Sequence, residues 1–299
     1  MQLPSVAEPR AVTPALLRSW PLPTPSGGKE GRGCVLVVGG SAETPGAVLL
    51  AAETALRCGA GKAQVATAGS VAAAVGVALP EALVRGLPET PSGAVSAGAA
   101  ALVRDLAESA DCVLVGPGLA DAQESAALLL GVVDGLETPV VVDALALGAL
   151  TEDASCLRHL EGRLVLTPNP GELAHTMHGS VEEIEATPAR HASELAEQAH
   201  AVVALGSATS WVASPDGQVW CDDSGRAGLG VSGSGDVKAG IVGGLMARGA
   251  SAAQAAVWAG HLHGRAGEHL AATVGPLGFL ARDLLPALPP LLADLATND

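Results

Sequence analysis

Short apolar runs alternate along the chain with longer Ala- and Leu-rich segments whose apolar positions recur at helical spacing. The short runs are apolar throughout rather than at every second position, which is typical of strands covered on both faces. We therefore predict a mainly parallel α/β sheet with helices on both sides. The predicted strands are 34–38, 63–67, 112–115, 140–142, 164–166 and 201–205, and the clearest helices are 46–58 and the segment that begins at Ser251 and continues through His263.

An antiparallel hairpin is predicted after the last of these strands. Residues 211–213 and 218–221 flank a turn formed by Pro215, Asp216 and Gly217. Trp211 and Trp220 lie on either side of this turn, and we expect them to pack across the two strands. Further on, Ser251 and Gln254 have the spacing of a capping box at the start of a helix.

The first 32 residues differ in composition from the rest. They are rich in Pro, Ser and Gly and contain only a short possible helix over 11–20. We expect residues 1–32 to be a lead-in that packs late or onto a neighbouring subunit. Residues 33–299 contain no convincing linker and are predicted to be one domain.

Small residues follow each predicted strand. In α/β sheets, ligands bind beyond the carboxyl ends of the strands, so these positions are the candidates for a site. Together they would line one edge of the sheet with backbone donors and a few carboxylates. They are Gly39-Gly40-Ser41, Gly116-Pro117-Gly118, Asp143-Ala144, the segment from Thr167 to Glu172, and Leu205-Gly206.

The sequence Gly233-Ser234-Gly235-Asp236 precedes a helix marked by Val237, Ile241 and Leu245. Residues without bulky side chains allow backbone N–H groups to converge on a phosphate at the positive end of that helix. Asp236 would then be ionised and able to take a proton from a hydroxyl beside the phosphate. The alternative is an ordinary glycine-rich turn in which Asp236 caps the helix.

Composition narrows the functional classes. The chain has 299 residues, 48% of them apolar, and a formal net charge of −15, which argues against nucleic acid as a partner. An anionic substrate would need a local pocket of backbone donors. The five cysteines are widely spaced, so we expect free thiols in a cytoplasmic protein, and the sequence favours neither secretion nor membrane insertion.

Seven motifs, in order, resemble those of the ADP/ATP-dependent NAD(P)H-hydrate dehydratases. The resemblance implies a ribokinase-like α/β fold with a mainly parallel central sheet, helices on both faces and an antiparallel hairpin near the nucleotide site. The motifs are VVGGSAETPGAVLLAAETALRCGAGKAQVAT (37–67), LPEAL (79–83), VGPGLA (115–120), VVDALAL (141–147), LTPNPGEL (166–173), GSGDVKAGIVGGL (233–245) and GFLARDLLP (278–286).

The resemblance implies a metabolite-repair lyase. In the family, the S-epimer of hydrated NADH or NADPH is returned to NADH or NADPH by dehydration driven by ADP or ATP with Mg²⁺, releasing phosphate and AMP or ADP. Asp236 would remove the proton of the ring hydroxyl as that hydroxyl is phosphorylated. Two alternatives stay open: a small-molecule kinase of the same fold, acting on a vitamin-precursor alcohol, and a non-catalytic nucleotide-binding protein.

The resemblance also assigns site residues. Ala47, Gly118, Asn169 and Asp236 match contacts to the hydrated cofactor. Leu205, Gly206, Ser207, Ala208 and Thr209, together with Gly233, Ser234 and Gly235, match the nucleotide and phosphate contacts. Asp143 and Glu172 are looser candidates for a place near the metal.

Two positions depart from the family pattern. Asn169 replaces the histidine of a TPHPGE motif, and Leu205 replaces the lysine of a KGxxT motif. Each change removes a possible positive charge from a phosphate site. We also expect a homo-oligomer, and an NAD(P)H-hydrate epimerase as a possible separate partner.

Overall fold

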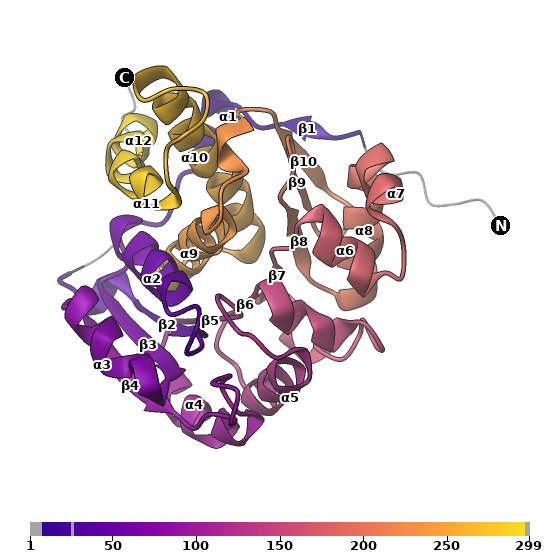
Figure 1. The fold of residues 1–299 in the computed structure, drawn as a ribbon. Helices are drawn as coiled ribbons and strands as arrows, with labels where there is room; N and C mark the ends of the chain where they lie inside the picture. The colour runs from indigo at the N-terminus through magenta and orange to yellow at the C-terminus, as the bar shows by residue number, and fades with distance from the viewer. Residues whose placement is uncertain (1–7, 25–26, 226, 297–299) are drawn as a thin grey trace.

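The computed structural model describes residues 8–24, 27–225 and 227–296. Within them, ten strands form one sheet in the order β1-β10-β9-β8-β7-β6-β5-β2-β3-β4 (Figure 1). The strands from β4 to β8 are all parallel, β9 is antiparallel to both of its neighbours, and β1 is parallel to β10. The strands are β1 Arg10–Ala11, β2 Cys34–Val38, β3 Lys62–Ala68, β4 Ala82–Leu87, β5 Cys112–Val115, β6 Val140–Val142, β7 Leu164–Leu166, β8 Val202–Leu205, β9 Ser210–Ala213 and β10 Val219–Asp222.

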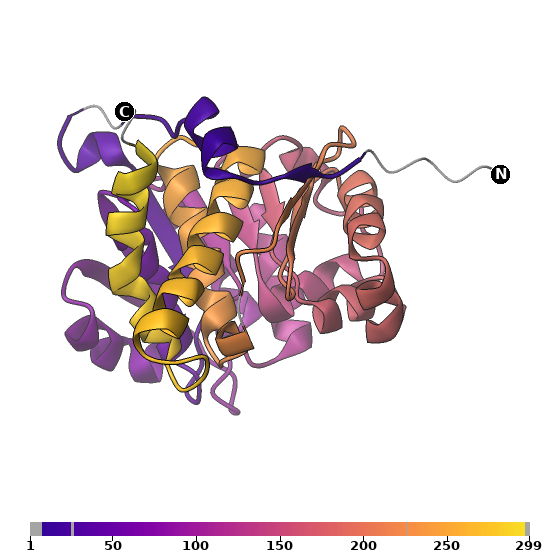
Figure 2. The ribbon, with the colours of Figure 1, turned by 90° about the horizontal axis from the view of Figure 1, so that it is seen from above.

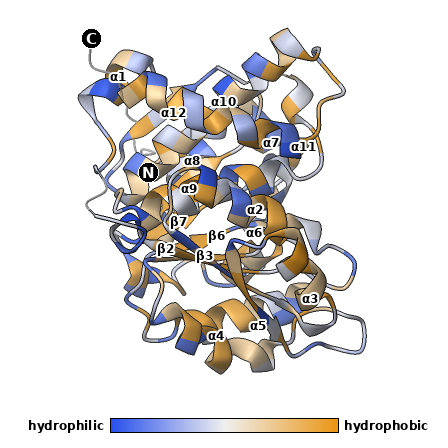
Figure 3. Cartoon of the chain, turned by 90° about the vertical axis from the view of Figure 1, so that its left-hand side faces the viewer, coloured by the Kyte–Doolittle hydropathy of each residue, from blue (hydrophilic) through white to orange (hydrophobic). Residues whose placement is uncertain are grey.

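Helices cover both faces of the sheet, as predicted. One face carries α2, α9, α10 and α12, and the other carries α4, α5 and α8. In Figure 3, α4 and α5 lie below the sheet and α2 and α9 lie above it. None of the described helices is long and apolar enough to cross a membrane. The helices are α1 Pro14–Ser19, α2 Gly46–Arg57, α3 Gly69–Ala78, α4 Ala100–Ala107, α5 Ala122–Val133, α6 Pro170–Thr176, α7 Val181–Ala186, α8 Pro188–Ala199, α9 Ser234–Ala247, α10 Ala252–Thr273, α11 Ala281–Leu284 and α12 Leu288–Ala296.

The hairpin forms where it is predicted, but its two tryptophans do not pair. Trp220 lies opposite Val212, and Trp211 lies opposite Cys221. Successive side chains of a strand point to opposite faces, so this register places Trp211 and Trp220 on different sides of the sheet. Trp220 instead stacks on Trp20, with ring centroids 6.0 Å apart.

The described part of the lead-in packs on the same chain. β1 pairs with β10 at the edge of the sheet (Figure 2), and Leu17 of α1 is fully buried. The side chains of Trp258 and Gln254 each donate a 3.1 Å hydrogen bond to the carbonyl oxygen of Trp20. The side chain of Gln254 therefore bonds to Trp20 instead of completing the capping box, although the side chain of Ser251 does cap α10. The domain boundary after residue 32 stays a prediction.

Helices α2 and α9 approach each other closely because glycines face the contact. A Cβ atom added at Gly240 would lie 2.5 Å from the carbonyl oxygen of Ala51, and one added at Gly244 would lie 2.7 Å from the Cα atom of Ala55. Any larger residue would push the helices apart. This contact sets the position of the start of α9, where Asp236 lies, relative to α2.

We predict that Gly244→Ala lowers the free energy of unfolding by about 1 to 3 kcal/mol, because its methyl group would meet backbone atoms. Gly243→Ala, one residue away, is the matched control. Its methyl group would meet only the side chains of Val35 and Leu114, the nearest atom at 3.5 Å, and the change should be within about 1 kcal/mol of neutral. Urea unfolding measures both variants, and equal losses would contradict this account of the α2–α9 contact.

Candidate active site

The glycine turns after β2 and β5 meet at the carboxyl edge of the sheet. The N–H of Gly40 donates a 2.7 Å hydrogen bond to the carbonyl oxygen of Pro117. Gly118 has a φ of 69°, and a Cβ atom there would lie 2.6 Å from the carbonyl oxygen of Thr44 and 2.8 Å from the Cβ of Ala47. Ala47 and Gly118, both predicted to contact the hydrated cofactor, are thus brought together at this edge of the sheet.

Gly233 fixes the start of α9. It is the N-cap residue, with a φ of 90°, and a Cβ atom on it would lie 2.6 Å from Leu50 of α2. Both the backbone conformation and the space favour glycine here. At Gly235 no atom lies within 4 Å of the place of a Cβ, so this residue faces open space. The first N–H groups of a helix lack partners within it and can bind an anion.

Asp236 lies in the first turn of α9 but does not cap it. Gly233 occupies the cap position, and no described residue donates a hydrogen bond to the Asp236 carboxylate. Burial raises the pKa of Asp236 to about 6, and the nearby charge of Glu172 adds to the effect. The pKa is therefore raised even though Asp236 lies in the first turn of a helix. The carboxylate is still mostly ionised at neutral pH and is poised to accept a proton.

Three carboxylates influence one another at this edge. Asp143 is buried and accepts a 2.6 Å hydrogen bond from the hydroxyl of Thr167. Burial raises the pKa of Asp143 well above its usual value, and the charges of Glu172 and Asp236 raise it further. The Glu172 carboxylate accepts a 2.9 Å hydrogen bond from the backbone N–H of Asn169, and burial raises its pKa.

The described residues hold no group of three or more His, Cys, Asp or Glu side chains placed to bind a metal ion. Asp143 and Glu172 therefore do not form a complete protein cage. Their oxygen atoms still fit Mg²⁺, which commonly takes one or two carboxylates and completes its shell with phosphate oxygens and water. A cation would also lower the carboxyl pKa values, which burial raises and, for Asp143, neighbouring charges raise further.

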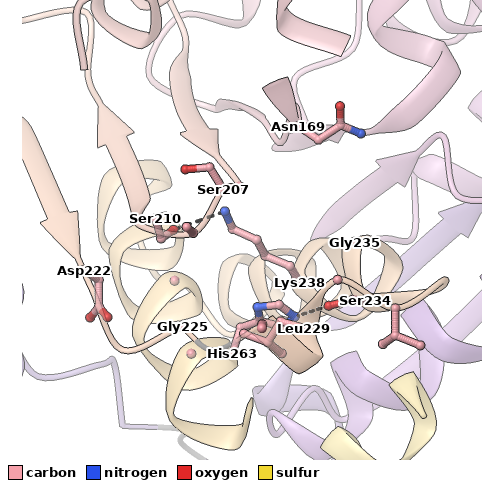
Figure 4. Close-up of a pocket in the computed structure, with 17 residues that line it drawn as sticks. Asn169, Ser207, Ser210, Asp222, Gly225, Leu229, Ser234, Gly235, Lys238 and His263 are labelled. Carbon is pink, nitrogen blue, oxygen red and sulfur yellow. Dashed lines mark hydrogen bonds between the residues drawn. The ribbon is translucent and has the colours of Figure 1, made fainter. Parts of the chain in front are cut away.

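A cavity of about 630 Å³ opens beside the start of α9, between the loops that leave β8 and β10 and the helices α9 and α10 (Figure 4). Five of the predicted nucleotide contacts line it: Gly206, Ser207, Ala208, Ser234 and Gly235.

Among the remaining predicted residues, Asn169 lines this cavity, whereas Leu205 and Thr209 do not. The Asn169 side chain caps α6 by accepting a 2.9 Å hydrogen bond from the N–H of Glu172. Leu205 is fully buried in the apolar core on the opposite face of the sheet. Thr209 and Leu205 line a smaller hollow of about 260 Å³ beside α6, α7 and α8.

Polar side chains that the sequence analysis did not assign, among them Asp222, Lys238 and His263, also line the cavity. Ser234 Oγ and His263 Nε2 are 2.9 Å apart. Burial, together with the charge of Lys238, lowers the pKa of His263 to about 3, so this imidazole is neutral. Asp222 lines the wall and lies 2.6 Å from Nδ1 of the buried His261. The sequence does contain one sign that Lys238 could belong to the site, because this lysine interrupts a run of small and apolar residues.

Comparison with known proteins identifies the family. The sequence profile of the NAD(P)H-hydrate dehydratase family matches residues 35–290. The chain belongs to this family. It is 47% identical over 285 residues to the ADP-dependent (S)-NAD(P)H-hydrate dehydratase of Xanthomonas campestris pv. campestris, covering 95% of this chain and 96% of that protein. A relative in Moorella thermoacetica, the bifunctional NAD(P)H-hydrate repair enzyme Nnr, is 37% identical, and the match spans 54% of its length.

The fold agrees with the family. The ADP/ATP-dependent NAD(P)H-hydrate dehydratase of Bacillus subtilis, co-crystallised with ATP and Mg²⁺, superposes with a TM-score of 0.80 at 26% identity, covering 97% of this chain and 99% of that one. A ribokinase-like protein of Enterococcus faecalis has a TM-score of 0.77 at 23% identity, with 96% of each chain covered, and shows the fold alone. The predicted ribokinase-like architecture is confirmed.

The raised pKa of Asp236 implies that its ionisation opposes folding. The folded-state pKa of about 6 exceeds the unfolded value of about 3.9, so wild-type stability is lost as the pH rises through this interval. Asp236→Asn should therefore raise the free energy of unfolding by about 1 to 2 kcal/mol at pH 7.5 and by almost nothing at pH 4. Urea unfolding at both pH values measures this. Asp105→Asn, on exposed α4, is the control, and a gain from Asp236→Asn that is the same at both pH values would refute the assignment.

Proposed function

We propose that this protein dehydrates the S-epimer of hydrated NADH or NADPH to NADH or NADPH, using ADP or ATP and releasing phosphate with AMP or ADP. The observation that carries the proposal is Asp236, a carboxylate with a pKa of about 6 on a glycine-bounded helix start beside a nucleotide-sized cavity. The near full-length similarity to the Xanthomonas dehydratase supports it independently.

The substrate and the nucleotide would approach Asp236 from two sides. The nucleotide would occupy the cavity, with its terminal phosphate on the backbone N–H groups of Ser234 and Gly235. The hydrated cofactor would lie over Ala47 and Gly118, two small residues that lie close together. Asn169 lies in the cavity wall, and its amide N–H₂ group stays available as a donor because capping uses only its oxygen.

The chemistry needs a base and a phosphate site together. The ring hydroxyl would attack the terminal phosphorus as Asp236 takes its proton, and the bond between that phosphorus and the nucleotide oxygen would break. The phosphate ester formed is a much better leaving group than hydroxide. Breaking its C–O bond, with loss of a ring proton, restores the dihydronicotinamide and releases phosphate. Mg²⁺ would neutralise the charge that develops on the phosphate oxygens, with Asp143 and Glu172 the candidate carboxylates to hold it.

We propose a cytoplasmic enzyme, because the five cysteines are all free thiols and three of them are buried. A homo-oligomer remains part of the proposal, as does a separate epimerase that would supply the S-epimer.

The direct test mixes the protein with hydrated NADPH, Mg²⁺ and either ADP or ATP, and follows the near-ultraviolet absorbance of the reduced nicotinamide. A rise that requires nucleotide supports the dehydratase and ranks the two donors. Accumulation of a stable phosphorylated alcohol from another substrate would indicate a kinase of the same fold. Absence of any nucleotide-dependent rise with intact substrate would refute the proposal.

Asp236→Asn should reduce turnover by about 10² to 10⁴-fold, because it removes the base and keeps the shape of the helix start. Nucleotide affinity should stay near that of the wild type. The same absorbance assay measures the first effect and calorimetric titration with ADP the second, with Asp105→Asn as the active control. Near-normal turnover of Asp236→Asn would exclude this residue as the base.

A further inference from the structure

Lys238 is a buried lysine in the wall of the cavity. The chain has three lysines. Lys29 is exposed, and Lys62 is partly exposed and pairs with Glu30 at the surface, whereas Lys238 on α9 is only 6% exposed. Burying an ammonium group is costly unless it meets partners that compensate for the lost water. A buried lysine at this place therefore requires an explanation.

The partners of Lys238 in the structure are both uncharged. Its Nζ atom donates a 3.1 Å hydrogen bond to the carbonyl oxygen of Ala204 and a 3.2 Å hydrogen bond to Ser210 Oγ (Figure 4). An ammonium group has three N–H donors, and the third has no partner among the described residues. The Nζ atom lies 3.4 Å from the place of a Cβ on Gly206, which lines the same cavity as Ser207 and Gly235.

The carboxylates near Lys238 influence it without pairing with it. No described carboxylate lies within ion-pair distance of Nζ. Burial lowers the pKa of Lys238 to about 8, against the opposing influence of Asp143 and Asp222. Asp222 is already bonded to His261 and Ser224. The ammonium group thus lacks a direct counter-ion, and of the described cavity-lining residues only Lys238 has an amine or guanidine side chain.

We propose that the Lys238 ammonium group binds a phosphate oxygen of the nucleotide in this cavity and supplies, from α9, the positive charge that Leu205 on β8 does not. The proposal rests on the proposed function for the identity of the ligand. Leu205 cannot supply such a charge, since it is a leucine buried in the core on the other face of the sheet. The chain would then hold its phosphates with a cation from a different element, on the cavity side of the sheet.

The test compares binding of ADP with Mg²⁺ and binding of adenosine by calorimetric titration at pH 7. Lys238→Met keeps the length and apolar stem of the side chain and removes the charge. We expect it to weaken ADP binding by about 10 to 100-fold and to leave adenosine binding within about twofold of the wild type. Lys62→Met, which removes a surface lysine far from the cavity lining, should leave both affinities unchanged.

A second measurement needs no variant. At pH 8 about half of the free protein would carry a neutral Lys238, so binding an anion should draw in up to about half a proton. Titrating ADP in buffers of different ionisation enthalpy reads this uptake. Burial holds His263 neutral, and the carboxylates of Asp143, Asp222 and Asp236 are all kept in Lys238→Met, so comparison with that variant isolates the contribution of Lys238. The uptake should vanish in Lys238→Met.

The outcomes separate the two proposals. Unchanged ADP affinity in Lys238→Met, equal weakening of ADP and adenosine, or no proton uptake by the wild type would overturn the role of Lys238, even if the protein dehydrates its substrate. Selective loss of ADP binding in Lys238→Met, together with a wild type that shows no dehydratase activity, would support the role of Lys238 and reject the proposed function. Failure of the wild type to bind either ADP or ATP at millimolar concentration would reject both.

Discussion

The close contact between α2 and α9 is the constraint on which the site depends. Gly240 and Gly244 allow backbone to approach backbone, and Gly233 continues the contact at the end of α9 by lying against Leu50. Because these contacts involve main-chain atoms, the relative position of the two helices has little freedom. The first turn of α9 is thereby held beside the start of α2, so the N–H groups that would face a phosphate keep a fixed position relative to Ala47 and Gly118.

A chain with a net charge of −15 must create locally the conditions for an anionic ligand. On the cavity side, backbone N–H groups, a helix N-terminus and Lys238 supply positive potential. Burial raises the pKa values of Asp143, Glu172 and Asp236, and the charge of Glu172 raises those of Asp143 and Asp236 further. The two kinds of group meet at the start of α9, where a reaction that moves both a proton and a phosphoryl group would need them.

Most of the fold could be predicted because it follows from local patterns. The central strands are continuous apolar runs, and each of those predicted forms within a residue or two of its expected ends. The edge strand β4 was not predicted, since its exposed positions and Arg85 make it unlike a buried strand. The Trp211–Trp220 pair was wrong because a shift of one residue in register changes the face of a side chain, and only the folded hairpin fixes that register.

The sequence likewise predicts part of the site but not all of it. The glycine turns and Asp236 could be placed from the chain order, because strand ends in a parallel sheet gather at one edge. Lys238 and His263 come from helices whose packing decides which residues face the cavity, and Ser234 meets His263 across 29 positions of sequence. The raised pKa of Asp236 also needed the structure, because burial and the position of Glu172 depend on how distant segments pack.

The intermediate pKa of Asp236 suits a catalytic base. An Asp with an unperturbed pKa would be fully ionised but a weak base, whereas one fully buried without any compensating charge or donor would stay protonated at neutral pH. Asp236 lies between these limits because it is partly buried beside Glu172 and sits in the first turn of a helix. A phosphate bound at that helix end would raise its pKa further, and a divalent cation would lower it. The nucleotide and its metal ion would thus act on the base as well as on the leaving group.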